Sequence, residues 1–420
     1  MEHPLRAALQ AELHSRPAIP VTAPARVLHL VLFDPDRPDA ARQAIIAVCA
    51  AHALPPPAST QRQATFALGD DLLYWEQHGE FGQVMLVQRL ADTPSRQWPA
   101  AVPEIVQSLL DACPSARLAA GDLLLLHEPN AALLGAGAFP SDDLALSRVS
   151  DGTAEVATDF GLDERGFTRF LAQARRLSPA RAGRLVRRLV EIDGYRMLAL
   201  LALPVMRQTV PGLAAVERDL ARLLDRMATV EGAEAERQLL EELTRMAREV
   251  ERIAQAQSFR FAAGRAYYAL VVKRLDELRE EPVDGYQGLA TYLERRLGPA
   301  MATCKAIADR QATLAERVER ATALLRTRVE VALHAQNQAL LVSMDRRANL
   351  QLRLQETVEG LSVVAISYYA LGILAKMVEP LAHRLLHLDP LVLEAGLAPL
   401  VVLAVWLGLR RIKRRVHEHG

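Results

Sequence analysis

Three ionisable side chains alternate along the segment Tyr74–Phe81, which reads Y-W-E-Q-H-G-E-F. If this segment is a β-strand, Glu76, His78 and Glu80 share one face, because side chains alternate between the two faces of a sheet. The opposite face would then carry Trp75, Gln77 and Phe81. Two carboxylates around an imidazole can bind a metal ion or transfer protons. The more common outcome for such a pattern is a polar strand face in water over an aromatic core side.

Other familiar chemical signatures are missing from the sequence. It contains no glycine-rich phosphate loop, no serine nucleophile elbow and no HExxH motif. Cys49, Cys113 and Cys304 lie far apart and match no ligand spacing, so we predict neither zinc nor a disulfide, and no cofactor. The 50 Lys+Arg residues balance 50 Asp+Glu residues, which gives no basic excess for nucleic acid.

The strongest pattern lies near the C-terminus. Residues 300–359 contain neither glycine nor proline, and two apolar runs follow, Leu361–Val378 and Leu391–Leu409. Eighteen helical residues span about 27 Å, close to the hydrocarbon thickness of a bilayer. We therefore expect a long stalk helix over 300–360 that continues into a transmembrane hairpin.

The charges beside the hairpin predict its orientation. Arg346, Arg347 and Arg353 precede the first run, and a basic stretch that includes Arg410 and Arg411 follows the second. Cytoplasmic flanks of membrane spans are enriched in Lys and Arg. This pattern places both ends of the hairpin, and with them the N-terminal region, in the cytoplasm.

Two further groups of residues belong to the hairpin. One helical face of the first run would carry Ser362, Ala365, Tyr369, Gly372 and Lys376. Small and hydroxyl residues on one face suit close helix packing, and they equally suit a water-filled lining. The outer loop and its borders offer the acidic residues Glu379, Asp389 and Glu394.

A seam of apolar residues in steps of four and three can be drawn along the stalk helix. Its first part, through Leu314, Val318, Ala321 and Leu325, resembles a coiled coil. Its second part contains polar residues, namely Arg328, Gln336, Ser343 and Arg347. These indicate a wet or partner-facing surface. A long helix packed on its own domain is the alternative.

The rest of the chain is predicted to be α+β. Expected strands are Val27–Phe33, Thr65–Leu68, Leu72–His78, Gly82–Gln88, Arg117–Leu126, Ala145–Val149 and Glu155–Thr158. Helices are expected at His3–Leu13, Asp39–Ala53, Glu104–Ala112, Glu164–Leu177, Ala180–Leu203, Leu213–Val230, Ala233–Arg279 and Gln287–Leu297. The predicted parts are 1–160 (cytoplasmic α/β domain), 161–299 (helical domain), 300–360 (stalk helix), 361–378 and 391–409 (spans), 379–390 (outer loop) and 410–420 (basic cytoplasmic tail).

Several long motifs resemble a bacterial family of uncharacterised proteins that are predicted to be membrane-anchored. They include E-L-H-S-R-P at 12–17, W-E-Q-H-G-E-F at 75–81 and R-F-A-A-G-R-A-Y-Y-A-L-V at 260–271. Two more are A-G-R-L-V-R-R-L-V-E-I-D-G-Y-R-M-L-A-L-L-A-L-P at 182–204 and Q-L-R-L-Q-E-T-V-E-G-L-S-V-V-A-I-S-Y-Y at 351–369. The resemblance implies the bacterial inner membrane and carries no established activity.

The predicted architecture also resembles that of CorA-type divalent-cation channels, which are ring-shaped homo-oligomers. Those channels carry a Gly-Met-Asn signature at the outer end of the first span, where this chain has Leu374–Pro380 instead. Lys376 would repel cations there.

Three functions remain open at this point. The first is a membrane-anchored, non-enzymatic homo-oligomer whose cytoplasmic part binds a protein partner, senses a ligand or acts as a scaffold. The second is a CorA-like channel or transporter, and the third is a membrane-tethered enzyme that uses Glu76, His78 and Glu80.

Overall fold

The computed structural model describes residues 3, 6, 10, 19–91, 98–114, 116–127, 139, 143–174, 177–230, 232–385 and 390–417, apart from the side chains of 233, 378–394, 397 and 412–417. Contacts divide the chain into two compact units. Unit 1 comprises Met1–Thr229 and Leu239–Thr322, and unit 2 comprises Val230–Gln238 and Ala323–Gly420.

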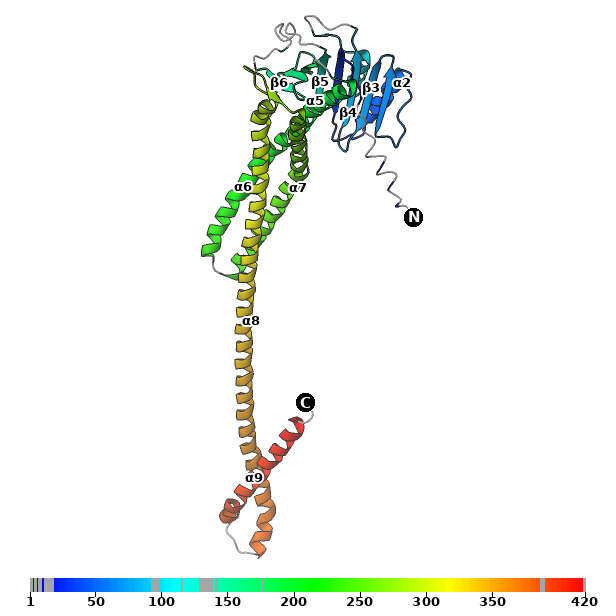
Figure 1. Ribbon diagram of the computed structural model, residues 1–420. Coiled ribbons are helices and arrows are strands. Elements are labelled where there is room, and N and C mark those ends of the chain that lie inside the picture. The colour runs from blue at the N-terminus through cyan, green and yellow to red at the C-terminus, as the bar shows by residue number, and fades with distance from the viewer. Residues whose placement is uncertain are drawn as a thin grey trace. The chain divides into compact units, whose positions relative to one another are not determined.

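The described part of unit 1 contains a mixed sheet with the strand order β2-β3-β4-β1-β5-β8-β7-β6-β9 (Figure 1). The strands are β1 (Ala25–Leu32), β2 (Gln63–Leu68), β3 (Asp71–Gln77), β4 (Gly82–Arg89), β5 (Arg117–Leu126), β6 (Ala145–Val149), β7 (Ala154–Thr158), β8 (Thr168–Ala174) and β9 (Glu281–Pro282). The pairing of β5 with β8 is parallel, and the other described pairs are antiparallel.

Both faces of the sheet are covered, because its central strands are apolar on both sides. Leu28 and Leu30 of β1 face the core beneath α2 (Ala40–Ala51) and α3 (Glu104–Ala112). Val27 and Val31 face the core beneath α5 (Pro179–Leu200), which lies across the other face (Figure 1). The sheet is therefore the middle layer of this unit.

Long helices continue from α5. They are α6 (Ala202–Thr229), α7 (Ala233–Leu278) and α8 (Leu289–Leu385), followed by α9 (Pro390–His417). In unit 1, Leu220 of α6, Leu243 of α7 and Leu314 of α8 are buried, and an ion pair between Glu217 and Arg310 joins α6 to α8. These contacts bring the N-terminal part of α8 against the α6–α7 pair.

Unit 2 contains the rest of α8, and α9 turns back beside its C-terminal end (Figure 1). Leu325 is fully buried, whereas most large apolar side chains from Val331 to Met377 are exposed. Among the described hairpin side chains, Ser367, Ala375 and Val401 are buried.

The predicted α+β class is confirmed, and the seven expected strands are found within two residues of their expected ends. The helix expected at Glu164–Leu177 is wrong, because Thr168–Ala174 is strand β8, paired with the central strand β5. The sheet therefore extends past the boundary expected at residue 160. Most of the expected helix His3–Leu13 lies outside the described residues.

Proline and glycine end fewer helices than expected. The break expected at Pro204 lies at Leu201, and α6 contains both Pro204 and Pro211. Proline is tolerated in the first turn of a helix, where its missing N–H would have no partner. Likewise α8 passes through Gly298 and Pro299, so that the stalk helix begins earlier than residue 300.

We predict that Gly183→Ala destabilises the protein by about 1–3 kcal/mol, because an added Cβ would overlap the carbonyl oxygen of Ile19. Gly298→Ala is the matched control, since only ordinary contacts surround it and alanine favours a helix by up to about 1 kcal/mol. Urea unfolding of the full chain in mild detergent measures both. Equal effects of the two substitutions would contradict the close approach of α5 to residue 19.

Candidate functional site

Glu76 lies in β3 and points toward α5, where its side chain is buried. Its Oε2 accepts a 2.8 Å hydrogen bond from the Tyr74 hydroxyl and lies 3.4 Å from Nη2 of Arg187 on α5. Trp75 faces the opposite core, as the alternating pattern predicts. The carboxylate is therefore part of the interface between the sheet and α5 rather than of a face in water.

His78 and Glu80 lie beyond the end of β3, where His78 lies beside Glu76 and Glu80 pairs with α7. The His78 ring stacks on Phe81 with 4.3 Å between ring centroids, and its Nε2 is 3.7 Å from Oε1 of Glu76. Glu80 accepts a 2.8 Å hydrogen bond from Arg260 of α7. Phe81 belongs to the core on the α5 side, so the expectation that it shares the Trp75 face is wrong.

The contacts of Glu76 continue into a chain of ion pairs between α5 and α7. Arg187 donates to Glu191 at 2.9 Å, and Glu191 also pairs with Arg274. Arg274 and Arg188 both contact Glu277. Although burial opposes the shift, the neighbouring arginines lower the pKa of Glu277. Glu277 therefore favours its charged form, and the ion pairs hold the two helices together.

A second buried polar group contains the Asp193–Arg196 pair, which the helical spacing predicts, and a histidine that was not anticipated from the sequence. His29, in the middle of β1, has its Nε2 3.0 Å from Oδ2 of Asp193 on α5, and both side chains are fully enclosed. Arg196 donates to Asp193 at 2.7 Å and to the Thr168 hydroxyl at 3.0 Å. Burial alone would raise the pKa of Asp193, but the charge of Arg196 and the contact with His29 lower it below its ordinary value.

Two features of the sequence could have indicated this group. Histidine interrupts the apolar strand Ala25–Leu32, and aspartate interrupts an apolar face of α5. Gly121 on the adjacent strand leaves the room that the imidazole occupies, because a Cβ there would overlap the ring. The partners lie far apart in sequence, so the pairing itself needs the fold.

The other face of the sheet carries a third group. Arg26 forms a fork with Asp122, with contacts of 2.9 and 2.7 Å, and also donates to the carbonyl oxygens of Pro99 and Ala101. Arg165 bonds the same Asp122 at 2.8 Å. All three nitrogens of the Arg26 guanidinium group have an acceptor. This group therefore holds residues 99–101, which precede α3, against the sheet and does not form an open site.

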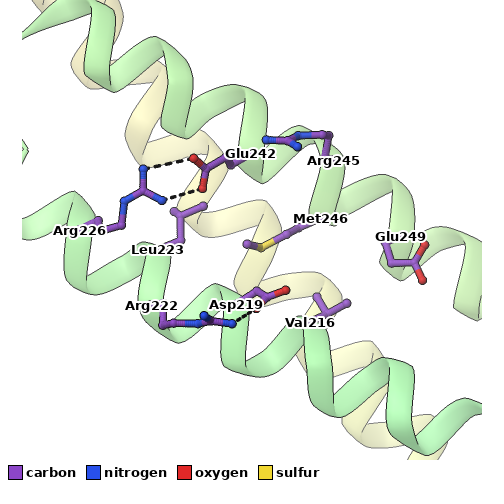
Figure 2. A pocket seen from close by; sticks show the side chains of 9 residues that line it. All are labelled: Val216, Asp219, Arg222, Leu223, Arg226, Glu242, Arg245, Met246 and Glu249. Carbon is purple, nitrogen blue, oxygen red and sulfur yellow. Dashed lines mark hydrogen bonds and ion pairs between the residues drawn. The ribbon is translucent and has the colours of Figure 1, made fainter.

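A concavity with charged walls lies between α6 and α7 of unit 1 and has a volume of about 530 Å³ (Figure 2). Its lining comprises Val216, Asp219, Arg222, Leu223, Arg226, Glu242, Arg245, Met246 and Glu249. Arg226 bridges to Glu242 across the groove with contacts of 2.8 and 3.1 Å, while Arg222 pairs with Asp219 (Figure 2).

The chemistry of this groove suits a protein surface better than a small anion. Its arginines alternate with carboxylates, and Val216, Leu223 and Met246 form the apolar part. A groove with an apolar floor and charged edges can bind an amphipathic helix, whose apolar face packs on the floor. Among the described residues, no group of three His, Cys, Asp or Glu side chains could hold a metal ion.

The predicted face of the first span is largely exposed in the single chain. Ala365, Tyr369, Gly372 and Lys376 are exposed, and the Ser362 hydroxyl donates to the Val358 carbonyl at 2.8 Å. Ser367 and Ala375 are the buried small residues instead. Asp389 and the side chains of Glu379 and Glu394 lie outside the described residues.

A family model described as "Protein of unknown function (DUF3422)" matches residues 1–416. The chain belongs to this family. Membership agrees with the resemblance of the long motifs and assigns no activity. No curated protein matches the chain.

Among the solved structures that match weakly is the "Salicylate hydroxylase substrate complex". It is 11% identical, with coverage of 71% of this chain and 57% of that chain, and the TM-score is 0.16. A similarity at this level carries no argument about fold or activity.

We predict that Asp193→Asn destabilises the protein by about 3–5 kcal/mol at neutral pH, because Arg196 loses its buried counter-charge. Asp219→Asn, in an exposed pair, should cost under about 1 kcal/mol. Since the pKa of Asp193 is lowered in the fold, its contribution is complete above the ordinary value of 3.8 and is lost as the pH falls further. Urea unfolding between pH 7 and pH 3 measures this loss, and a pH-independent difference would contradict it.

Proposed function

We propose that this protein is a membrane-anchored homo-oligomer whose N-terminal unit binds a partner or ligand in the bacterial cytoplasm, as a sensor or scaffold. The observation that carries the proposal is the exposure of apolar side chains at the C-terminal end of α8. Leu361, Val364, Tyr368 and Met377 expose 73%, 67%, 75% and 74% of their surface. Fully burying such a side chain stabilises a protein by about 1.5–3 kcal/mol. Transfer of these side chains from water into lipid or a protein interface would therefore be strongly favourable.

Composition supports a lipid environment for this segment. Among the described residues, two helical segments are long and apolar enough to cross a membrane, a criterion that core helices also meet. They are Pro179–Thr229, which comprises α5 and α6, and Leu289–Met377 of α8. The apolar residues of the first, such as Leu198 and Ala202, pack in the core of the sheet. The most apolar window of the second has a mean hydropathy of 1.7 and is only 11% buried.

The second half of the hairpin fits the same interpretation. Leu400, Leu403 and Leu407 of α9 are exposed, and Arg410 lies over the Trp406 ring at 4.8 Å. Tryptophan next to arginine is typical of the interface between lipid and water, and basic residues favour the cytoplasmic side. The N-terminal unit and the C-terminus would then share the cytoplasm.

The groove between α6 and α7 supports a binding role for the cytoplasmic unit (Figure 2). The enzyme hypothesis has less support, since Glu76 and Glu80 are engaged with arginines from α5 and α7. A CorA-like channel remains the second candidate, because α8 continues without a break from unit 1 into the first apolar run. The absent Gly-Met-Asn signature and the exposed Lys376 argue against cation conduction.

We predict that deleting residues 361–420 moves the protein from the membrane pellet to the soluble fraction, because both apolar runs are removed. Deleting only 412–420 is the control and should leave the protein in the pellet. Fractionation of cell lysates with immunodetection measures both, and circular dichroism checks that the shortened chain is folded. Full-length protein in the soluble fraction would contradict membrane anchoring.

A further inference from the structure

The part of α8 between residues 329 and 361 carries an apolar stripe that nothing in the described chain covers. Its large members are Leu333, Leu340, Met344, Leu354, Val358 and Leu361. They are between 52% and 73% exposed. In contrast, Leu314, Val318 and Leu325, earlier in the same helix, are buried. The helix therefore changes from a covered to an uncovered apolar face along its length.

The spacing of the stripe is that of a coiled coil. Leu333, Leu340, Leu354 and Leu361 are separated by multiples of seven residues, and Met344 and Val358 follow four residues after members of this series. The remaining seam positions are Asn337, Arg347 and Gln351. The seam expected from the sequence pattern is a different one, which passes through Arg328, Gln336, Ser343 and Arg347. The seam through Leu333 and Leu340 is rotated around the helix relative to that one and contains fewer polar residues.

The opposite face of the same segment combines charged residues with the exposed apolar residues Val342 and Leu352. It carries Asp345, Arg346, Arg353 and Glu356, all exposed. The positions that flank the seam contain no Asp, Glu, Lys or Arg. They are His334, Gln336, Leu341, Ser343, Ala348, Leu350, Gln355 and Thr357. Two identical helices can thus pair along the seam without placing like charges opposite each other at its edges.

We propose that residues 333–361 of α8 form a parallel, in-register two-stranded coiled coil with a second copy of this chain. This inference rests on the proposed membrane anchoring, because α8 runs on into the first apolar run and fixes the height of the seam above the bilayer. A second anchored copy presents the same seam at the same height and in the same direction. In a symmetric pair each residue meets its own equivalent.

The polar seam positions agree with a pair of identical helices. Asn337 would meet Asn337 of the other copy, and a buried asparagine pair specifies register and a two-stranded state at some cost in stability. Arg347 would pack its aliphatic part in the seam while its guanidinium group reaches water. The two guanidinium groups would still repel each other, so Arg347 should weaken the pair.

The test measures the mass of the full-length protein in mild detergent over a range of concentrations. We expect a dimer for the wild type and at least a tenfold higher dissociation concentration for Leu340→Glu. Arg347→Leu should lower the dissociation concentration several-fold. Val342→Glu is the matched control, because Val342 is 54% exposed and lies on the opposite face, and it should change nothing.

The alternatives give different results. A monomeric wild type, a larger ring, or equal effects of Leu340→Glu and Val342→Glu would each overturn the coiled coil. Membrane fractionation of Leu340→Glu separates the two proposals. Its retention in the pellet leaves the anchoring intact, whereas soluble wild-type protein would remove the anchoring itself.

Oxidative cross-linking tests register and direction. Met344→Cys should form an intermolecular disulfide in membranes, because parallel in-register helices bring the two residues 344 together. Asn349→Cys, on the opposite face, should not. The native Cys49, Cys113 and Cys304 are buried, which leaves the introduced thiol as the accessible one. Equal cross-linking at 344 and 349 would contradict the proposed seam.

Discussion

The close contact between α5 and the sheet is the interaction on which unit 1 depends. Gly183 and Gly194 allow the helix to approach Ile19 and Val31 without the obstruction of a Cβ. Between these glycines, Leu185, Leu189 and Ile192 fill the core, and Asp193 reaches His29 through the same contact. Because α6 begins directly after α5, this contact also fixes where the long helices leave the sheet.

The two units differ in how their charged and apolar side chains are covered. In unit 1 the buried charges are paired across elements, as in Arg26 with Asp122 and Arg274 with Glu191, and the two faces of the sheet are covered. In unit 2 most large apolar side chains of α8 lack cover in the single chain. An uncovered apolar surface of this kind marks a contact with lipid or protein. Under the proposed function, α8 and α9 of unit 2 contact lipid and a second copy of the chain, and the groove between α6 and α7 is a surface for a partner.

Much of the fold could be predicted from local pattern, and the exceptions have physical reasons. Strand β5 matches its expected bounds because Arg117–Leu126 is a bounded apolar run. Strand β8 resembles a helix in sequence, since Phe167, Phe170 and Ala174 recur at steps of three and four, and a central strand that is buried on both faces shows no alternation. Its parallel pairing with β5 decides its structure.

The candidate site was less predictable than the fold. The sequence pattern correctly separates Glu76 from Trp75, but it cannot supply the arginines that engage the carboxylates. Arg187 lies 111 residues from Glu76, and Arg260 lies 180 residues from Glu80. Sequence pattern alone therefore leaves a polar face in water, and the packing of α5 and α7 turns it into an interface.

The most direct test of membrane anchoring is the labelling of introduced cysteines by a water-soluble maleimide in protein reconstituted into lipid vesicles. Ile373 and Val342 are similarly exposed in the single chain, at 62% and 54%. If α8 enters the membrane after residue 361, Ile373→Cys reacts only after denaturation in detergent, whereas Val342→Cys reacts in intact vesicles opened to the reagent on both sides. Equal labelling of the two positions in vesicles would contradict the account.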